Sequence, residues 1–262
     1  MPFLVIIMKF SIVYKNGGEQ IAVTVRKKVT EHGHEISQYT RVEDFSGAPG
    51  SDAIIIIGGD GSVLRVANRE NKPIILVRYK SFGFFASCNP GEIDSFITDF
   101  LKGRTFFGER NKIEASFNGR MDQAVNEFMI KNFDDSAVAF EMEIKGANGK
   151  EGILSVYGDG IIIATPSGST GHALSFGGPI LHKDCKCFLL FPIAPIRASL
   201  RPMVLPGSAE ILIDSKKEVL LIADGQRRYG TKRIRIKQSN EKLILVEKRE
   251  DFYERIKRVM EE

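Results

Sequence analysis

The sequence predicts an α/β N-terminal domain followed by an all-β, sandwich-like C-terminal domain. Up to about residue 103, apolar runs of strand length alternate with stretches of helical periodicity, as in a parallel sheet covered by helices. After Gly103 the chain changes to short apolar alternations separated by Gly, Asn, Asp and Pro, a pattern typical of antiparallel strands. We therefore expect an α/β domain over 1–103, a β-rich domain over 104–247, and a C-terminal helix within 248–262 that packs back on the first domain.

Each expected element of the first domain ends where the periodicity changes or where a polar or Gly/Pro-bearing loop begins. Glu19–Thr30 is expected to be a helix, because Ile21, Val25 and Val29 recur at four-residue spacing on one face. The remaining elements are expected as strands at Met8–Tyr14, Glu35–Tyr39, Ala53–Ile57 and Pro73–Val77, and as helices at Ser62–Asn68 and Glu92–Lys102.

The apolar run Phe3–Met8 at the start of the chain is expected to be a buried strand. It lacks a basic n-region and a small-residue cleavage site, and it is too short to cross a bilayer. Met8 resembles an alternative initiator, which leaves open whether residues 1–7 belong to the native chain. No other segment approaches membrane-spanning length, so we expect a cytoplasmic protein with no membrane partner.

The second domain is expected to consist of many short strands, each a brief apolar alternation. They are expected at Ile113–Phe117, Gln123–Ile130, Val138–Ile144, Ile153–Tyr157, Gly160–Ala164, Phe188–Phe191, Ala209–Ile213, Glu218–Ala223, Arg233–Lys237 and Leu243–Val246, with a closing helix at Asp251–Met260. In one of them, Arg233, Arg235 and Lys237 share a face opposite Ile234 and Ile236, and we expect the charged face to be solvated.

Composition excludes several classes of protein. A chain of 262 residues with 43% hydrophobic content can bury one large core or two smaller ones. The net charge of +4 and pI of 8.9 reflect an excess of basic residues too small for a nucleic-acid partner. Three cysteines do not form the dense, even pattern of a secreted disulfide scaffold, so a reducing compartment is expected.

The stretch IIIIGGDGS at 54–62 places a carboxylate, Asp60, within a glycine loop suited to a phosphate. An ionised Asp repels a phosphate unless a cation lies between them or the Asp is there to take a proton. Leu64 stands where the dinucleotide fingerprint needs its third glycine, and no GxxxxGK[ST] stretch exists. The loop follows an expected strand and precedes an expected helix, which is where ligands bind in parallel sheets.

Two further stretches favour a polar, phosphorylated ligand. Residues 158–180, GDGIIIATPSGSTGHALSFGGPI, gather glycines and hydroxyl side chains behind an apolar strand. Residues 125–128, VNEF, place Asn126 and Glu127 inside an expected apolar strand, where unpaired polar groups are costly. A ligand hydroxyl or amine is one possible partner for these two side chains, and a structural hydrogen bond is the other.

Taken in order and at these separations, GGDGS, VNEF, GDG with TPSGST, and SFGGPI resemble the NAD kinase family over about residues 51–226. The resemblance implies transfer of a phosphoryl group from ATP or polyphosphate to the 2'-hydroxyl of the adenosine ribose of NAD. It also implies an NAD kinase-like two-domain architecture, a cleft between the domains, and a homodimer or homotetramer. Chemistry of this kind needs a divalent cation, which we expect to be Mg²⁺.

The same resemblance implies roles for particular residues. Asp60 would be the catalytic acid-base residue. No protein cage for a metal is expected, although Asp60 could reach the Mg²⁺. The phosphate loop would comprise Gly58, Gly59, Gly61 and Ser62, and NAD would be bound by Phe84, Asn126, Glu127, Asp159, Thr165, Ser167, Thr170, Gly171 and Ser175. In similar enzymes the residue that matches Asp159 reaches the NAD of a neighbouring subunit.

The sequence departs from the family pattern at several positions. Ser62 replaces the usual Thr, and Gly171 and His172 stand where Ala and Tyr are common, which puts the ring contact in doubt. RYKSFGFFA at 78–86 keeps only Gly83 and Phe84 of the usual motif. PIAPIRASLRP at 192–202 lacks the usual His-Thr-Leu, so Arg197 has no assigned role, whereas ADGQ at 223–226 fits a late turn of the family.

Three alternatives remain open from the residues alone. A phosphofructokinase or lipid kinase shares a GGDG loop, and the compound that accepts phosphate would distinguish it. A non-catalytic NAD(P)-binding regulator would have no use for Asp60. His182, Cys185 and Cys187 cluster, but Cys-x-Cys spacing on a strand favours buried or half-buried structural cysteines over a zinc site.

Overall fold

The computed structural model describes residues 7–80, 83–134, 136–146, 149–196, 200–248 and 252–261. It divides into two compact units, one comprising Met1–Glu109 with Leu243–Glu262 and the other Arg110–Lys242. Among the described residues, no helix combines the length and apolar character needed to cross a bilayer.

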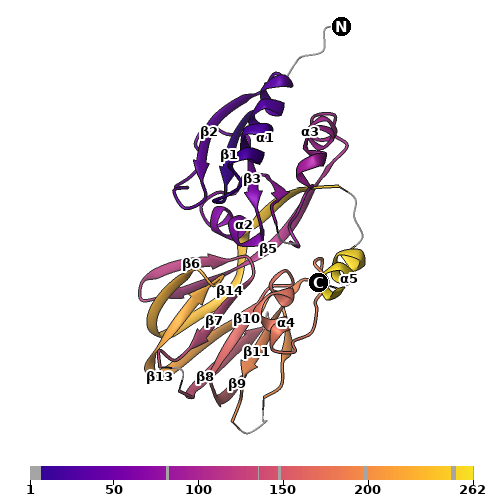
Figure 1. Cartoon of the computed structure of the whole chain (residues 1–262). Helices are drawn as coiled ribbons and strands as arrows, with labels where there is room; N and C mark the ends of the chain where they lie inside the picture. The colour runs from indigo at the N-terminus through magenta and orange to yellow at the C-terminus, as the bar shows by residue number, and fades with distance from the viewer. Residues whose placement is uncertain are drawn as a thin grey trace. The chain divides into compact units, whose positions relative to one another are not determined.

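The first unit contains a parallel sheet together with several helices (Figure 1). Its strands are β1 (Lys9–Tyr14), β2 (Glu35–Arg41), β3 (Ala53–Gly58) and β4 (Ile74–Arg78), and its helices are α1 (Glu19–Glu31), α2 (Asp60–Ala67), α3 (Ile93–Leu101) and α5 (Phe252–Glu261), with a 3₁₀ turn, η1 (Pro90–Glu92), before α3. The strands lie in the order β2-β1-β3-β4, and Leu245 extends the sheet beyond β4 by pairing with Ile74.

Strand β3 lies at the centre of this sheet, and every residue from Ala53 to Ile57 is fully buried. A strand covered on both faces reads as a continuous apolar run, which is why its sequence predicted it well. Helices α1 and α3 share one core with β1, β3 and β4; α1 contributes Val25 and Val29, and α3 contributes Phe96.

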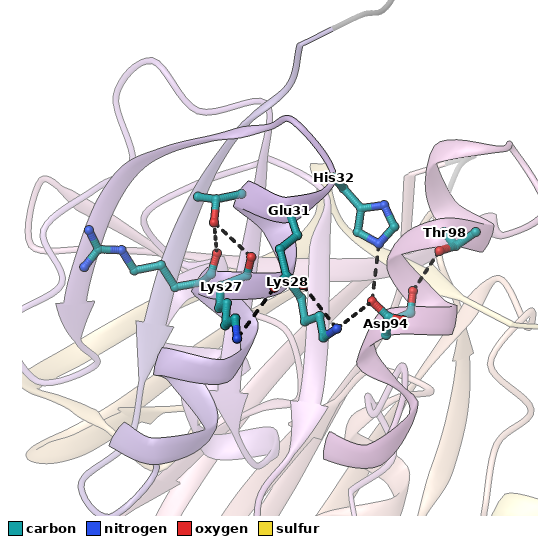
Figure 2. Close-up of polar contacts among 8 residues, drawn as sticks. Lys27, Lys28, Glu31, His32, Asp94 and Thr98 are labelled. Atoms are coloured by element: carbon teal, nitrogen blue, oxygen red, sulfur yellow. Dashed lines mark hydrogen bonds and ion pairs between the residues drawn. The ribbon is translucent and has the colours of Figure 1, made fainter.

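Helices α1 and α3 also meet at their exposed ends, as Figure 2 shows. Lys28 Nζ lies 3.5 Å from Asp94 Oδ1 and 3.2 Å from Glu31 Oε2, and His32 Nε2 lies 3.4 Å from Asp94 Oδ1. Because these side chains are solvated, the ion pairs contribute little to the stability of the unit. The apolar faces of the two helices therefore hold them together.

Three expectations for the first unit need correction. The expected strand Phe3–Met8 is wrong at its described end, because Ile7 is 55% exposed and β1 begins at Lys9; residues 3–6 lie outside the described part. Helix α2 begins at Asp60 instead of Ser62, since Gly59 is extended and an acidic residue is favoured in a first helical turn. The expected helix Glu92–Lys102 is α3, and Glu92 caps the 3₁₀ turn before it.

The second unit is built from antiparallel strands, so the prediction of an α/β domain followed by a β domain is confirmed (Figure 1). Its elements are β5 (Phe106–Phe117), β6 (Arg120–Ala124), β7 (Glu127–Lys131), β8 (Val138–Gly146), β9 (Gly149–Gly158), β10 (Gly160–Ala164), η2 (Gly168–Thr170), α4 (His172–Ser175), β11 (Cys187–Ile193), β12 (Met203–Pro206), β13 (Glu210–Ala223) and β14 (Arg227–Glu247).

Strand β13 links two sets of strands in this unit. Residues Glu210–Ser215 pair with β8, whereas Leu220–Ala223 pair with β7, and the register shifts between the two segments. Phe128, Phe140 and Phe188 come from different strands and lie in one core. A long strand that changes partners at a bulge thereby encloses a sandwich-like core.

The strand bounds differ from expectation where polar residues lie within strands. Ala209–Ile213 and Glu218–Ala223 are parts of one strand, β13, and Arg233–Lys237 and Leu243–Val246 are parts of β14. The expected strand Gln123–Ile130 is instead two strands, β6 and β7. Strand β12 was not expected.

The charged face of β14 is solvated, as predicted. Ile234 and Ile236 are fully buried, whereas Arg233, Arg235 and Lys237 are exposed and pair with acidic side chains.

Candidate functional site

The glycine loop lies at the carboxyl end of β3, where β3 passes into α2. At Gly58 any larger residue would collide with the chain, because an added Cβ would lie 2.5 Å from Ser62 Oγ and 2.9 Å from Ser62 Cβ. Gly59 is the extended residue before the helix, and Gly61 is exposed with open space around it. The loop therefore keeps Ser62 buried against Gly58 and has its exposed residue at Gly61.

Asp60 is held by the segment that follows β4. Its Oδ2 accepts a hydrogen bond from the Phe84 amide at 2.8 Å, and its Oδ1 accepts one from the Phe85 amide at 3.1 Å. An added Cβ on Gly83 would lie 2.4 Å from Asp60 Oδ1, so a glycine is required there. The predicted residue Phe84 thus contributes its backbone amide to the orientation of Asp60.

The pKa of the Asp60 carboxyl is raised above its ordinary value, chiefly because burial penalises the charged form. The hydrogen bonds from Phe85 and Phe84 and the nearby Arg255 cation act in the opposite direction. A carboxylate with a raised pKa and a fixed orientation is suited to accept a proton from a bound hydroxyl.

In the second unit, Val125, Asn126 and Glu127 form a tight turn around the carboxylate of Asp224. Asp224 Oδ2 accepts the Val125 amide at 3.0 Å, while Oδ1 accepts the amides of Asn126 at 2.8 Å and Glu127 at 3.2 Å. The Asp224 amide in turn donates to the Glu127 carbonyl at 3.0 Å. Asn126 consequently lies in a bend between β6 and β7, which corrects the expectation that both polar residues lie inside one strand.

Sequence reasoning did not place Asp224 in the site. The ADGQ turn was the available signal, because Asp tolerates a left-handed backbone and Asp224 has φ of +48°. The side chain of Asp224 orients the turn from Val125 to Glu127, which lies 97 to 99 positions earlier in the sequence.

The TPSGST segment closes over the same turn. Thr165 donates its amide to the Asn126 carbonyl at 2.8 Å and its hydroxyl to the Val125 carbonyl at 2.6 Å. An added Cβ on Gly168 would lie 2.0 Å from the Asn126 carbonyl oxygen. Predicted site residues Thr165, Asn126 and Glu127 are thereby brought together.

Among the described residues, two buried oxygen atoms of this cluster have no hydrogen-bond partner: Asn126 Oδ1 and Glu127 Oε2. Burying such atoms without a partner costs about 1–3 kcal/mol each, so each needs a hydrogen-bond donor from solvent or from a bound ligand. An added Cβ on Gly171 would lie 3.1 Å from Glu127 Oε2, so this glycine keeps the space beside the carboxylate open.

The other carboxylate oxygen of Glu127 is occupied by His172, which the sequence marked only as a departure from the family pattern. Glu127 Oε1 and His172 Nδ1 are 2.7 Å apart, with Glu127 buried and the His172 side chain 53% exposed. The hydrogen bond that the His172 ring donates to the Glu127 carboxylate raises the pKa of His172. Glu127 is thus presented to a ligand through Oε2 alone.

The His172–Glu127 pair predicts a pH dependence of stability. Because the pKa of His172 is raised by folding, its contribution is fully present below the unfolded value of about 6.5 and is lost as pH rises through the folded value. Replacing His172 with Gln should therefore lower the melting temperature more at about pH 6 than at about pH 9. Thermal unfolding at both pH values measures this difference.

Ser175→Ala, at an exposed residue of the same helix α4 that does not titrate, is the control for that measurement. An equal loss of melting temperature by His172→Gln at both pH values would contradict the pairing.

The remaining predicted NAD-lining residues lie in or near the same segments but do not take part in the hydrogen bonds described above. Asp159 is exposed at the turn between β9 and β10, and Ser175 is exposed at the end of α4. Thr170 donates its hydroxyl to the Ser167 carbonyl at 2.9 Å, within the TPSGST segment. These assignments stay predictions, and Arg197, Ser81 and Phe82 lie outside the described residues.

Within the described part of the chain, no group of three or more His, Cys, Asp and Glu side chains is arranged to hold a metal. Cys187 is half-buried at the start of β11, as expected, but Cys185 precedes the strand and is exposed, which corrects the expectation that both lie on one strand face.

Comparison with known proteins gives a consistent result. Residues 125–248 match the family model described as the ATP-NAD kinase C-terminal domain. The NAD kinase of Methanospirillum hungatei is 31% identical over 255 residues, which cover 92% of this chain and 93% of that protein. The NAD kinase of a Thermotoga species is 29% identical over 241 residues, 88% of this chain and 89% of that protein.

Two solved structures share the fold. An Archaeoglobus fulgidus NAD kinase in complex with ATP superposes with a TM-score of 0.81 and 21% identity, over 97% of this chain and 98% of that one. Yeast NADH kinase complexed with NADH gives a TM-score of 0.84 and 19% identity, over 98% of this chain and 88% of that one. With sequence relatives that match along nearly its whole length and the fold shared as well, the chain belongs to the NAD kinase family.

Proposed function

We propose that this NAD kinase transfers the terminal phosphoryl group of ATP to the 2'-hydroxyl of the adenosine ribose of NAD, with Asp60 as the general base. The observation that carries the assignment of Asp60 is its carboxylate, oriented by the amides of Phe84 and Phe85 and raised in pKa by burial. In phosphoryl transfer, positioning and charge stabilisation supply most of the catalysis, and a carboxylate orients or deprotonates the attacking hydroxyl.

The second unit binds NAD in this proposal. Asn126 Oδ1 and Glu127 Oε2 are acceptors that have no donor among the described residues, so they fit hydroxyl or amino groups of the nucleotide. Asp224 and Thr165 keep these two side chains oriented by holding the backbone of their turn. His172 keeps the Glu127 carboxylate from rotating.

The donor phosphates would be received by the glycine loop at the N-terminus of α2, where Gly61 is exposed. Because the described residues form no metal cage, we propose that the divalent cation, Mg²⁺, is held mainly by the phosphates of the donor. When bound, the cation neutralises phosphate charge that would otherwise repel Asp60.

We also propose a homodimer or homotetramer located in the cytoplasm. The exposed position of Asp159 at the β9–β10 turn is compatible with its predicted reach to the NAD of a neighbouring subunit. Light scattering of the purified protein would measure the number of subunits.

The activity predicts that NADP forms from NAD only when a phosphoryl donor and a divalent cation are both present. Purified protein should be incubated with NAD and with ATP or polyphosphate in turn, and NADP measured with an NADP-specific dehydrogenase. Asp60→Asn, purified in the same way, controls for contaminating kinases. NAD binding without NADP formation under any donor would indicate a non-catalytic regulator instead.

A further inference from the structure

The two amides that orient Asp60 belong to a short irregular segment, Gly83–Ala86, which must itself be held in place. On the side of the sheet, it is anchored by the Ser87 amide, which donates to the Leu76 carbonyl at 2.8 Å. The carbonyl groups of Phe84 and Ala86 are not part of a strand ladder. The donor that binds both carbonyl groups lies in the C-terminal helix.

That partner is Arg255, in the C-terminal helix α5, the yellow helix in Figure 1. Its guanidinium donates to the Phe84 carbonyl and, at 3.4 Å, to the Ala86 carbonyl. The planar fork of an Arg suits this kind of bridging, since its donors have a fixed geometry. The same residue, Phe84, therefore donates its amide to Asp60 and accepts from Arg255.

Arg255 is buried, unlike the polar residues around it on the same helix. It is only 8% exposed, and Glu247, which is 3% exposed, pairs with it at 3.2 Å. On the same helix Tyr253, Glu254 and Lys257 are exposed. A buried ion pair gives little net stability compared with apolar residues, because both groups lose their hydration. The burial of this pair is better explained by the hydrogen bonds that Arg255 donates to the carbonyl groups of Phe84 and Ala86.

We propose that Arg255 is a positioning residue for phosphoryl transfer: it fixes the Phe84–Ala86 segment, and through it the Asp60 carboxylate. This role depends on the proposed function of Asp60 as the general base. A small misplacement of a catalytic group can cost about 10²-fold in rate, so an indirect contact of this kind is large enough to measure.

The test is a double-mutant cycle between positions 255 and 60, with turnover and the KM for NAD measured for each variant. Arg255→Met in the otherwise unchanged protein should lower kcat by about 10- to 100-fold and leave the KM for NAD within about threefold. In the Asp60→Asn background the same change should lower kcat by less than about threefold, because the group that it positions is no longer a base.

Two further variants keep the test decisive. Arg255→Lys retains the charge and the pairing with Glu247 but loses the fork, so it should fold and show a smaller loss of kcat that also disappears in the Asp60→Asn background. Lys257→Met, two residues along on the exposed side of α5, is the matched control and should behave like the unchanged protein.

The outcomes separate this inference from the proposed function. An equal loss of kcat in both backgrounds, or a loss confined to the KM for NAD, would overturn the positioning role. Normal turnover by Asp60→Asn itself would instead overturn the general-base assignment, whatever Arg255 does.

Discussion

Replacing Asp60 with Asn is expected to lower turnover by on the order of 10²- to 10⁴-fold, the usual effect of removing a general base. Asn has the same size, and its side-chain oxygen can still accept one of the two amides that now bind the carboxylate. The folded structure should survive. The dissociation constant of NAD should change by less than about tenfold, because the residues proposed to bind NAD, apart from Phe84, lie in the second unit.

Steady-state kinetics and isothermal titration with NAD measure the two effects separately. Gly91→Ala, at a position with open space around it, is a control for a change near the same sheet. Near-normal turnover would contradict the base assignment, whereas loss of NAD binding together with turnover would make Asp60 a ligand anchor. Rescue of the rate by higher Mg²⁺ would identify Asp60 as a cation site.

Replacing Asp224 with Ala is expected to damage both stability and NAD affinity, with a KM for NAD raised by about 100-fold or more. Three consecutive amides would lose their acceptor, and the two buried ones, of Val125 and Glu127, would cost about 1–3 kcal/mol each. Lys112, 1% exposed and 3.7 Å from Glu241, would also lose a neighbouring negative charge. The turn that carries Asn126 and Glu127 would then no longer be fixed.

Urea unfolding and the KM for NAD measure the two losses. Asp224→Asn, which keeps one acceptor oxygen, should have an intermediate effect. Asp134→Ala is the matched control, because Asp134 also accepts a backbone amide, from Ser136 at 3.1 Å, but on an exposed loop. If Asp224→Ala behaves like Asp134→Ala, then the turn is held by Thr165 and the strands alone.

The sequence predicted the features that local pattern determines. The continuous apolar run Ala53–Ile57 predicted a central strand, because both faces of such a strand are buried. The spacing of Val25 and Val29 predicted the buried face of α1. The glycine loop was placed correctly between strand and helix. The start of α2 was missed by two residues because Asp60 is both the functional group and the first residue of the helix.

The features that the sequence did not predict depend on contacts between distant residues. Asp214 and Ser215 are polar and suggest a loop, but β13 continues through them because they pair with β8. Asp224 acts on a turn nearly a hundred positions earlier, and Arg255 acts on Phe84, 171 positions earlier. Periodicity carries no information about such pairs, so they emerge only from the fold.

The first unit takes its residues from both ends of the chain, Met1–Glu109 and Leu243–Glu262, whereas the second is one uninterrupted stretch. During translation the second unit is therefore complete before Leu245 can pair with Ile74 or Arg255 can reach Phe84. The contacts that finish the first unit have the greatest sequence separation and carry the highest loop-closure cost. With the role proposed for Arg255, a nascent chain becomes catalytically competent only after this residue has left the ribosome, and a product truncated before Arg255 should lack full turnover.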